Sequence, residues 1–438
     1  MPDATTRPSR RESALVLAAL VLSVLLATEA VRFAIAGKLG ESTEIPQIRR
    51  ALVLDPANPK LYHQLGMQYY TSLEQTNLED SVEDLRRATE LRPEQAFYWS
   101  DLASVCEALG DGTCADRAIR RALTLSPMTP QVEWQAANYD LRTGRKDEAL
   151  AGFRRLVTLD PSYAASTFAV CLKVLDDPAV ISQKVVPPQI DLQLAYVNAL
   201  MKGGKADFAH EVWVQAISNA PRFPFALARP YLERLIELGR GREAEAVWQD
   251  LLKLGVVIRP ASEDQDNLIF NGDFEQVPLN AGFDWRYQET RYLALDLADP
   301  SAYNGHRCLR VDFVTSRNEE YEPVYEIVRV VPLHSYLLSA YVRTEGITSD
   351  AGPRLRVTDP VCPTCLEIST DGVAGTTPWH RVSVRFSTGA STLSVKVSVW
   401  RPRSRTFPTE VTGTFWLDQV LLKATPSNEP VSASNSLP

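Results

Sequence analysis

The chain repeats one octapeptide four times at a nearly constant spacing. The copies occupy residues 49–56, 86–93, 120–127 and 154–161, and their closing prolines lie 37, 34 and 34 residues apart. A fixed period near 34 indicates one supersecondary unit stacked in an array, because a single unit cannot bury its apolar face without its neighbours. The repeat therefore predicts an elongated helical array, an architecture that usually binds partners.

Within each unit, large and small residues recur at helical spacing. In the clearest copy they are Trp99, Leu102, Ala103 and Cys106, followed on a second helix by Ala115, Ile119, Ala122 and Pro127. The small residues let two helices approach closely, and the proline ends the second helix. This pattern resembles the tetratricopeptide (TPR) repeat. The resemblance implies pairs of antiparallel helices and a groove for a protein partner.

Helical pairs continue beyond the last octapeptide. A second set of residues recurs 35 positions later, as Gly204, Ala209 and Trp213 followed by Gly239, Ala244 and Trp248. We therefore predict one TPR-like α-solenoid over residues 41–255, with a divergent segment at residues 185–188. The doubled arginines of the octapeptides fit the polar face of the second helix, or alternatively an anionic ligand or lipid surface.

An apolar segment precedes the repeats. Residues 14–36 number 23, and at about 1.5 Å per residue they can cross a hydrocarbon core of about 30 Å. Arginines precede the segment and acidic residues follow it, which places residues 1–13 in the cytoplasm and all later domains outside it. The alternative is a cleaved signal peptide, with Ala34-Ile35-Ala36 as its cleavage site. We favour an uncleaved single-pass anchor in a bacterial inner membrane.

The six cysteines allow several pairings. Cys106 and Cys114 could bridge the two helices of their repeat, and Cys362 and Cys365 form a CxxC in a proline-bearing loop. Local disulfides, unpaired thiols and a metal or redox site are all compatible with this usage. A lone CxxC supplies too few ligands for zinc, which takes four.

The hydrophobic period changes to two in the last third of the chain. Residues 256–267 have the composition of a linker, and from residue 268 about ten short alternating runs are separated by Gly, Pro, Asn and Asp turns. This pattern predicts an antiparallel β-sandwich or jelly roll over residues 268–423, followed by a disordered tail at residues 424–438. The predicted fold class is thus a multidomain α and β chain with a transmembrane helix, a TPR-like solenoid and a jelly roll.

Four segments of this module resemble the carbohydrate-binding modules of the galactose-binding-like superfamily. They are NLIFNGDFE (267–275), YLLSAYVRTEG (336–346), WHRVSVRF (379–386) and GTFWLDQVLL (413–422). The resemblance implies a structural calcium ion held by Glu275 and Asp418. It also implies that exposed aromatic rings and nearby polar groups bind a sugar. The candidates are Trp285, Tyr287, Trp400 and Arg401.

Nothing in the sequence resembles a reaction centre. The nucleophile elbow, the zinc-protease motif and the phosphate-binding loops are absent, and the five histidines are scattered. A nucleic-acid partner is disfavoured because the chain has 54 acidic residues and only 46 basic ones. We expect a non-enzymatic scaffold of the cell envelope, connected with polysaccharide synthesis or export. A glycan-active enzyme and a purely structural periplasmic spacer are the alternatives.

Overall fold

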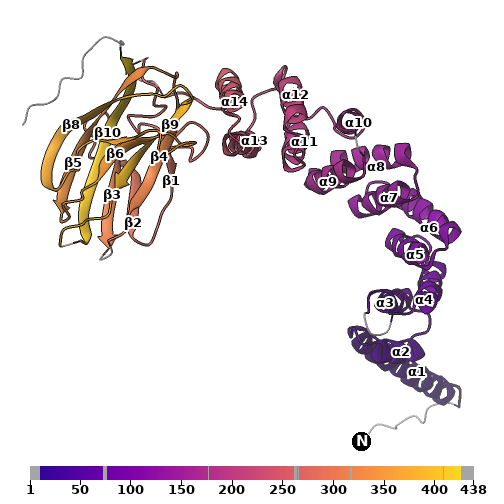
Figure 1. Cartoon of the computed structure of the whole chain (residues 1–438). Helices are drawn as coiled ribbons and strands as arrows, with labels where there is room; N and C mark the ends of the chain where they lie inside the picture. Colours follow the sequence, from indigo (N-terminus) through magenta and orange to yellow (C-terminus); the bar gives the residue numbers. More distant parts are fainter. Residues whose placement is uncertain are drawn as a thin grey trace, which may run out of the picture. The chain divides into compact units, whose positions relative to one another are not determined.

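A computed structural model describes residues 10–72, 76–175, 177–260, 264, 266–315, 318–407 and 409–425 (Figure 1). Contacts divide the chain into two compact units, Met1–Pro187 and Pro188–Pro438. The division falls at the divergent segment predicted at residues 185–188, so helices predicted as one solenoid belong to two units. Most of the predicted cytoplasmic N-terminus (1–13) and of the predicted disordered tail (424–438) lies outside the described residues.

The apolar segment forms a long helix that continues into the repeats. Helix α1 spans Arg10–Gly40, and its part Ala14–Gly40 is long and apolar enough to cross a membrane, a property that a signal sequence shares. Its last turns pack on α2 (Ile45–Leu54), where Ala36 is buried. The helix therefore extends beyond the predicted boundary at residue 36, because its end is covered by the array.

The first unit continues with antiparallel helix pairs, as the 34-residue period predicts. They are α3 (Pro59–Thr71) with α4 (Leu78–Leu91), α5 (Ala96–Leu109) with α6 (Gly112–Leu125), and α7 (Pro130–Arg142) with α8 (Lys146–Leu159), followed by α9 (Ala164–Val174) and α10 (Pro178–Lys184). Helices α3, α5 and α7 lie along one side of this unit, and α4, α6 and α8 lie along the other (Figure 1).

The small residues of the repeat work as the sequence predicts. A Cβ atom on Gly66 would lie 2.8 Å from Leu85, so α3 and α4 can approach this closely only with glycine there. In the next repeat, Ala103 is buried in the core that α5 shares with α6. A disulfide joins Cys106 to Cys114 across that pair, and another joins Cys362 to Cys365.

The second unit begins with two further helix pairs. They are α11 (Ile190–Lys202) with α12 (Ala206–Ile217), and α13 (Phe225–Glu237) with α14 (Gly241–Lys253). The recurring tryptophans Trp213 and Trp248 are both buried, and the recurring glycines Gly204 and Gly239 end the preceding helices at positive φ. The 35-residue recurrence therefore marks true repeats of the helix pair.

In the part of the chain that the structure describes, ten strands follow in two antiparallel sheets. They are β1 (Arg286–Tyr287), β2 (Leu293–Asp299), β3 (Cys308–Thr315), β4 (Tyr321–Arg329), β5 (Ser335–Ile347), β6 (Arg354–Thr358), β7 (Glu367–Ser369), β8 (Gly375–Ser387), β9 (Ser394–Arg401) and β10 (Val411–Thr425). Sheet A has the order β1-β4-β9-β6-β7, and sheet B has the order β2-β3-β10-β5-β8.

The alternating residues of both sheets pack between them. Leu309, Val311 and Phe313 of β3 meet Val395, Val397 and Val399 of β9 in one core. This confirms the predicted β-sandwich. Its opening and closing segments are joined by a hydrogen bond from Leu268 N to Leu422 O, and β10 runs two residues past the predicted boundary at 423.

The helix pair α13–α14 packs directly on the sandwich. Trp248 lies edge-on to Phe270 and Phe283, with ring centroids 5.1 Å and 5.9 Å away. Glu233 forms an ion pair with Arg286, Nη1 to Oε2 2.6 Å and Nη2 to Oε1 3.0 Å. Although residues 256–267 have a linker's composition, Trp248 before them and Phe270 and Phe283 after them form a buried aromatic contact.

Candidate functional site

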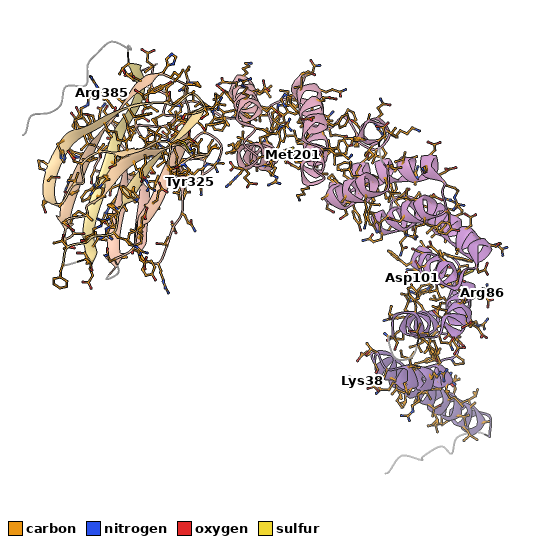
Figure 2. The ribbon with its side chains drawn as sticks, in the orientation of Figure 1. Lys38, Arg86, Asp101, Met201, Tyr325 and Arg385 are labelled. Carbon is orange, nitrogen blue, oxygen red and sulfur yellow. A yellow bond between two sulfur atoms is a disulfide. The ribbon has the colours of Figure 1, made fainter. Side chains whose placement is uncertain are left out.

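The outward-facing side chains of sheet A form a surface that combines aromatic rings with charged groups. Strand pairing places Tyr325 of β4 opposite Ser398 of β9, and Ser398 opposite Arg356 of β6. Trp400 and Lys396 lie two residues on either side of Ser398 on the same face, and Ser398 itself is fully covered by its neighbours. We call the four partly exposed residues Tyr325, Arg356, Lys396 and Trp400 the sheet A platform (Tyr325 is labelled in Figure 2).

The ring of Trp400 is fixed in position at the end of this platform. Its Nε1 donates to Glu320 Oε1 at 2.7 Å, and the Arg356 guanidinium lies 4.4 Å from the ring centroid. Arg354, the next outward residue of β6, lies 5.8 Å away. The ring is partly exposed and held by polar neighbours, as a stacking surface for a ligand requires.

The two cations of the platform, Arg356 and Lys396, are paired with a carboxylate beside it. Arg356 contacts Glu322 at 2.8 Å, and Lys396 contacts the other oxygen of Glu322 at 2.7 Å. Burial raises the pKa of Glu322, but hydrogen bonds from Lys396, Ser398 and Arg356 outweigh it and hold the pKa below its usual value. The carboxylate therefore stays ionised at neutral pH. The platform presents hydrogen-bond donors and acceptors without an excess of one charge.

Of the four predicted sugar-binding residues, only Trp400 belongs to the platform. Trp285 is fully buried, stacks on Phe274 with centroids 5.2 Å apart, and donates its Nε1 hydrogen to Asn271 O. Tyr287 packs against the sandwich core. The expectation that Trp285 offers its ring to a sugar does not fit this position, because the ring fills the interior.

Arg401 is also inside the sandwich. Its guanidinium donates to Asn318 Oδ1, Glu319 O, Ser349 Oγ and Thr409 O, at 2.8 to 3.1 Å. These contacts tie three loops together and leave the side chain 1% exposed. Arg401 therefore supports the end of the sandwich and is not available to a ligand.

The two carboxylates predicted to hold calcium meet at one loop. Glu275 Oε1 accepts hydrogen bonds from His306 N and Arg307 N, and Asp418 Oδ2 accepts from Tyr303 N at 2.8 Å. Burial raises the pKa of Asp418 to about 6.

Calcium takes six to eight oxygen ligands, whereas N–H groups direct hydrogens toward these carboxylates. Across the residues that the structure describes, no three or more His, Cys, Asp or Glu side chains gather as a metal site. Glu275 and Asp418 anchor the loop through its main chain, and the calcium ion that the resemblance implies stays a prediction.

The helical unit has a separate candidate surface between α5 and α7. A cavity of about 200 Å³ is lined there by Ser104, Glu107, Trp134, Asn138 and Arg142, among others. Glu107 and Arg142 form a two-point ion pair at 2.6 and 2.7 Å across this cavity. Ring, amide and charged groups on facing first helices are the chemistry of a peptide groove.

The doubled arginines are engaged within the array. The first arginine of each octapeptide reaches the following repeat: Arg49 to Asp80 (4.0 Å), Arg86 to Asp111 (3.8 Å), Arg120 to Asp140, and Arg154 to the carbonyls of Gln183 and Val186. The cavity that contains Arg86 and Arg87 is also lined by Glu79, Glu83, Asp84 and Glu90. These acidic neighbours favour the packing role over an anionic ligand.

Comparisons with known proteins find likenesses for separate parts of the chain. No protein-family model and no curated protein matches the chain. The solved structure of YrrB, described as a TPR protein with an unusual peptide-binding site, is 18% identical over 41% of this chain and 90% of its own, with a TM-score of 0.32.

A crystal structure of MamA is 17% identical over 40% of this chain and 84% of its own, with a TM-score of 0.26. A structure described as CBM4 is 13% identical over 36% of this chain and 99% of its own, with a TM-score of 0.27. The chain's own elements show paired helices followed by a β-sandwich of two antiparallel sheets.

Sequence reasoning missed most of the platform. Tyr325, Arg356 and Lys396 were not candidates, because they lie on three strands and meet only through strand pairing. One local signal was available. Once Trp400 is taken as outward-facing, the period of two places Ser398 and Lys396 on the same face.

Proposed function

We propose that the β-sandwich binds a glycan on the sheet A platform and that the protein acts as a non-enzymatic, membrane-anchored scaffold of the bacterial cell envelope. The observation that carries this proposal is the Trp400 ring, partly exposed and fixed by Glu320 and Arg356. A sugar presents apolar C–H faces and hydroxyl edges. The Trp400 ring can stack on the C–H face of the sugar, and the charged groups beside the ring can bind its hydroxyls.

The helical repeats would hold a protein partner. The cavity between α5 and α7 supplies an aromatic ring, amides and an ion pair in one groove. A partner held there and a glycan held by the sandwich would be brought together by one chain. This pairing supports a role in polysaccharide synthesis or export.

Anchoring by an uncleaved α1 is supported by the packing of its end. Cleavage after Ala36 would remove Ala36, a buried residue of the helix that packs on α2, and would leave only residues 37–40 of α1. Glu29 and Arg32 pair at 2.7 Å near the end of the apolar segment, which suits a helix leaving the hydrocarbon core. The soluble domains then follow the span on the extracytoplasmic side.

The test measures glycan binding by the full chain in detergent micelles. Isothermal titration against linear oligosaccharides of glucose, xylose, mannose and galactose should identify a ligand whose affinity falls at least about tenfold in Trp400→Ala. The matched control is Trp379→Ala, which removes a partly exposed tryptophan from β8 of sheet B.

Four results would contradict the proposal. Equal affinity in Trp400→Ala, or loss only in Trp379→Ala, would place the site elsewhere. Absence of glycan binding together with absence of a co-purifying protein would favour a structural spacer. Release of shortened sugars would favour a glycan-active enzyme.

A further inference from the structure

A second opening lies at the far end of the outer face of sheet A. It is a cavity of about 400 Å³ between the turn that joins α13 to α14 and the ends of β4 and β9. The helices contribute Ile236 and Gly241 to its lining, and the sandwich contributes Ile327, Arg329, Val361 and Leu393. The volume falls in the range of small-molecule sites, about 300 to 1,000 Å³. We call it the junction crevice.

The helical wall of this crevice is fixed to the sandwich. Besides the Glu233–Arg286 ion pair, Arg329 Nε lies 3.2 Å from Glu245 Oε2 of α14. Gly282 N donates to Glu233 Oε1 at 2.7 Å. Polar contacts thus tie α13 and α14 to two different regions of the sandwich, so the turn between them keeps its place beside sheet A.

The sandwich wall is equally constrained. Val361 belongs to a loop closed by the Cys362–Cys365 disulfide, and Asp359 Oδ1 accepts hydrogen bonds from Val361 N and Cys362 N at 2.8 and 3.0 Å. The Val361 side chain nevertheless is 85% exposed, and Leu393 is 42% exposed. Apolar side chains held open at the rim of a cavity are suited to a ligand with apolar faces.

The crevice is continuous with the sheet A platform. The partly exposed residues on this face of β9 are Trp400, Lys396 and Ser394, which lines the crevice, and Ser398 between the first two is covered. The six-residue distance from Trp400 to Ser394 corresponds to about 20 Å. On β4, Tyr325 is followed on the same face by Ile327, which also lines the crevice. A linear ligand stacked on Trp400 and lying along the strands would therefore reach the helices.

The charges along this path favour a neutral ligand. Arg329 is paired with Glu245, and Lys396 is paired with Glu322. Glu237, the acidic residue contributed by α13, is paired with Arg234 at 2.9 Å. Along β4 and β9, therefore, an anionic sugar polymer meets only cations that already have a carboxylate partner.

We propose that α13–α14 forms one wall of the glycan groove, so that a neutral linear polysaccharide runs from Trp400 along sheet A into the junction crevice. This inference rests on the proposed glycan binding and deepens it. The helical repeats then take part in selecting the ligand, since only a chain long enough to span the face contacts them.

The test compares short and long oligosaccharides of the same neutral sugar on the full chain in micelles. Ser391→Trp places a ring in the crevice from an exposed position, and Ser383→Trp places the same ring on an exposed position of β8 in sheet B. Ser391→Trp should weaken binding of the long oligosaccharide at least fivefold and leave binding of the short one unchanged. Ser383→Trp should change neither, and thermal melting should show that both variants fold.

The outcomes separate this inference from the proposed function. If Trp400→Ala weakens binding but Ser391→Trp binds long and short chains as the wild type does, the groove ends before the helices and this inference is overturned. If neither the wild type nor any variant binds a glycan, both proposals fail. Preferential binding of alginate or hyaluronate over neutral chains would overturn the assignment of a neutral ligand.

Discussion

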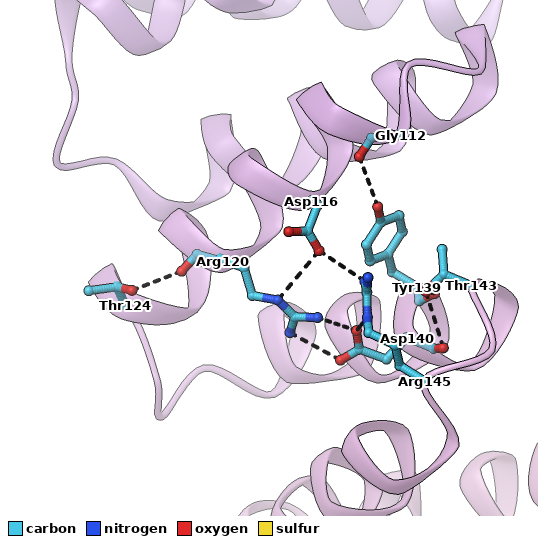
Figure 3. A network of polar contacts seen from close by, with 8 residues as sticks. All are labelled: Gly112, Asp116, Arg120, Thr124, Tyr139, Asp140, Thr143 and Arg145. Carbon is cyan, nitrogen blue, oxygen red and sulfur yellow. Dashed lines mark hydrogen bonds and ion pairs between the residues drawn. The ribbon is translucent and has the colours of Figure 1, made fainter.

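A single buried carboxylate connects two repeats of the helical array. Asp140 of α7 accepts hydrogen bonds from Arg120 of α6 and from Arg145 at the start of α8, the latter at 2.8 Å (Figure 3). Asp116 contacts the same two arginines at 3.7 and 3.0 Å but is itself exposed. The network therefore has an inner and an outer carboxylate around one pair of cations.

We expect Asp140→Ala to lower the free energy of unfolding of the helical unit by about 2 kcal/mol. This lies below the 3 to 5 kcal/mol typical of broken buried pairs, because both arginines keep access to water. Asp116→Ala should cost less than about 1 kcal/mol, as exposed pairs do. Urea denaturation followed by circular dichroism measures both. Equal losses in the two variants would contradict the inner role of Asp140.

Buried carboxyl groups give the sandwich an unusual dependence on pH. Burial raises the pKa of Asp284 to about 6 and raises the pKa of Glu326 well above its usual value. The side chain of Glu326 lies in the core, where Oε1 accepts from Phe270 N and Oε2 has no hydrogen-bond partner. The folded chain therefore binds more protons than the unfolded chain above about pH 4.

Stability of the sandwich should accordingly fall as the pH rises from about 4.5 to 7. Differential scanning calorimetry of the full chain should show a higher Tm near pH 5 than near pH 7.5. Glu326→Gln keeps the oxygen that accepts from Phe270 N and removes the titration, so it should reduce this slope. A Tm that rises steadily to pH 7.5 would show that these groups titrate normally.

At the scale of elements, the contact between helices and sandwich depends on one glycine. Gly282 has φ +62°, and a Cβ atom there would lie 2.5 Å from the Trp248 ring. Gly346 has nearly the same φ, +65°, with nothing within 4 Å of its Cβ position. Alanine substitutions at the two glycines therefore distinguish two contributions to the loss of stability. Both variants strain a left-handed backbone, but only the one at Gly282 adds a steric clash.

Gly346→Ala should destabilise the protein by about 1 kcal/mol, through backbone strain alone. Gly282→Ala should cost at least about 2 kcal/mol more, because the ring must move from its aromatic contacts. Chemical denaturation monitored by tryptophan fluorescence compares the two. Similar denaturation midpoints for the two variants would mean that α14 can move away from Gly282 without loss of stability. The helical wall of the junction crevice would then not be fixed in position.

The elements that the sequence predicts are those with a period. The 34-residue repeat predicts the hairpins because Gly66 and Ala103 sit where helices approach, and the period of two predicts the strands. Alternation separates two faces of a strand without saying which face is covered. Trp285 and Trp400 were therefore equal candidates, although one fills the core and the other lies outside.

Contacts between distant segments had no signal in the sequence. Glu233 and Arg286 lie 53 positions apart, and their ion pair forms only in the folded chain. The composition of residues 256–267 indicates a linker, but it contains no information on what the flanking elements touch. For the same reason the sequence does not predict the junction crevice, because its lining residues come from elements on both sides of that segment.

At the scale of the whole molecule, the account requires an exported chain that keeps its anchor. Alkaline phosphatase fused after Pro438 should be active in a bacterial host, and β-galactosidase fused there should be inactive. Intact mass of the purified protein should include residues 14–36. An active β-galactosidase fusion would place the domains in the cytosol, and a mature chain that starts after Ala36 would identify a cleaved signal peptide.

The most direct test of the central claim is to follow binding and chain length in one experiment. The full chain in micelles is incubated with envelope polysaccharide, and bound polymer and new reducing ends are both measured over time. We predict saturable binding that Trp400→Ala weakens, with no new reducing ends. Growth of reducing ends, or binding that is independent of the sheet A platform, would contradict the account.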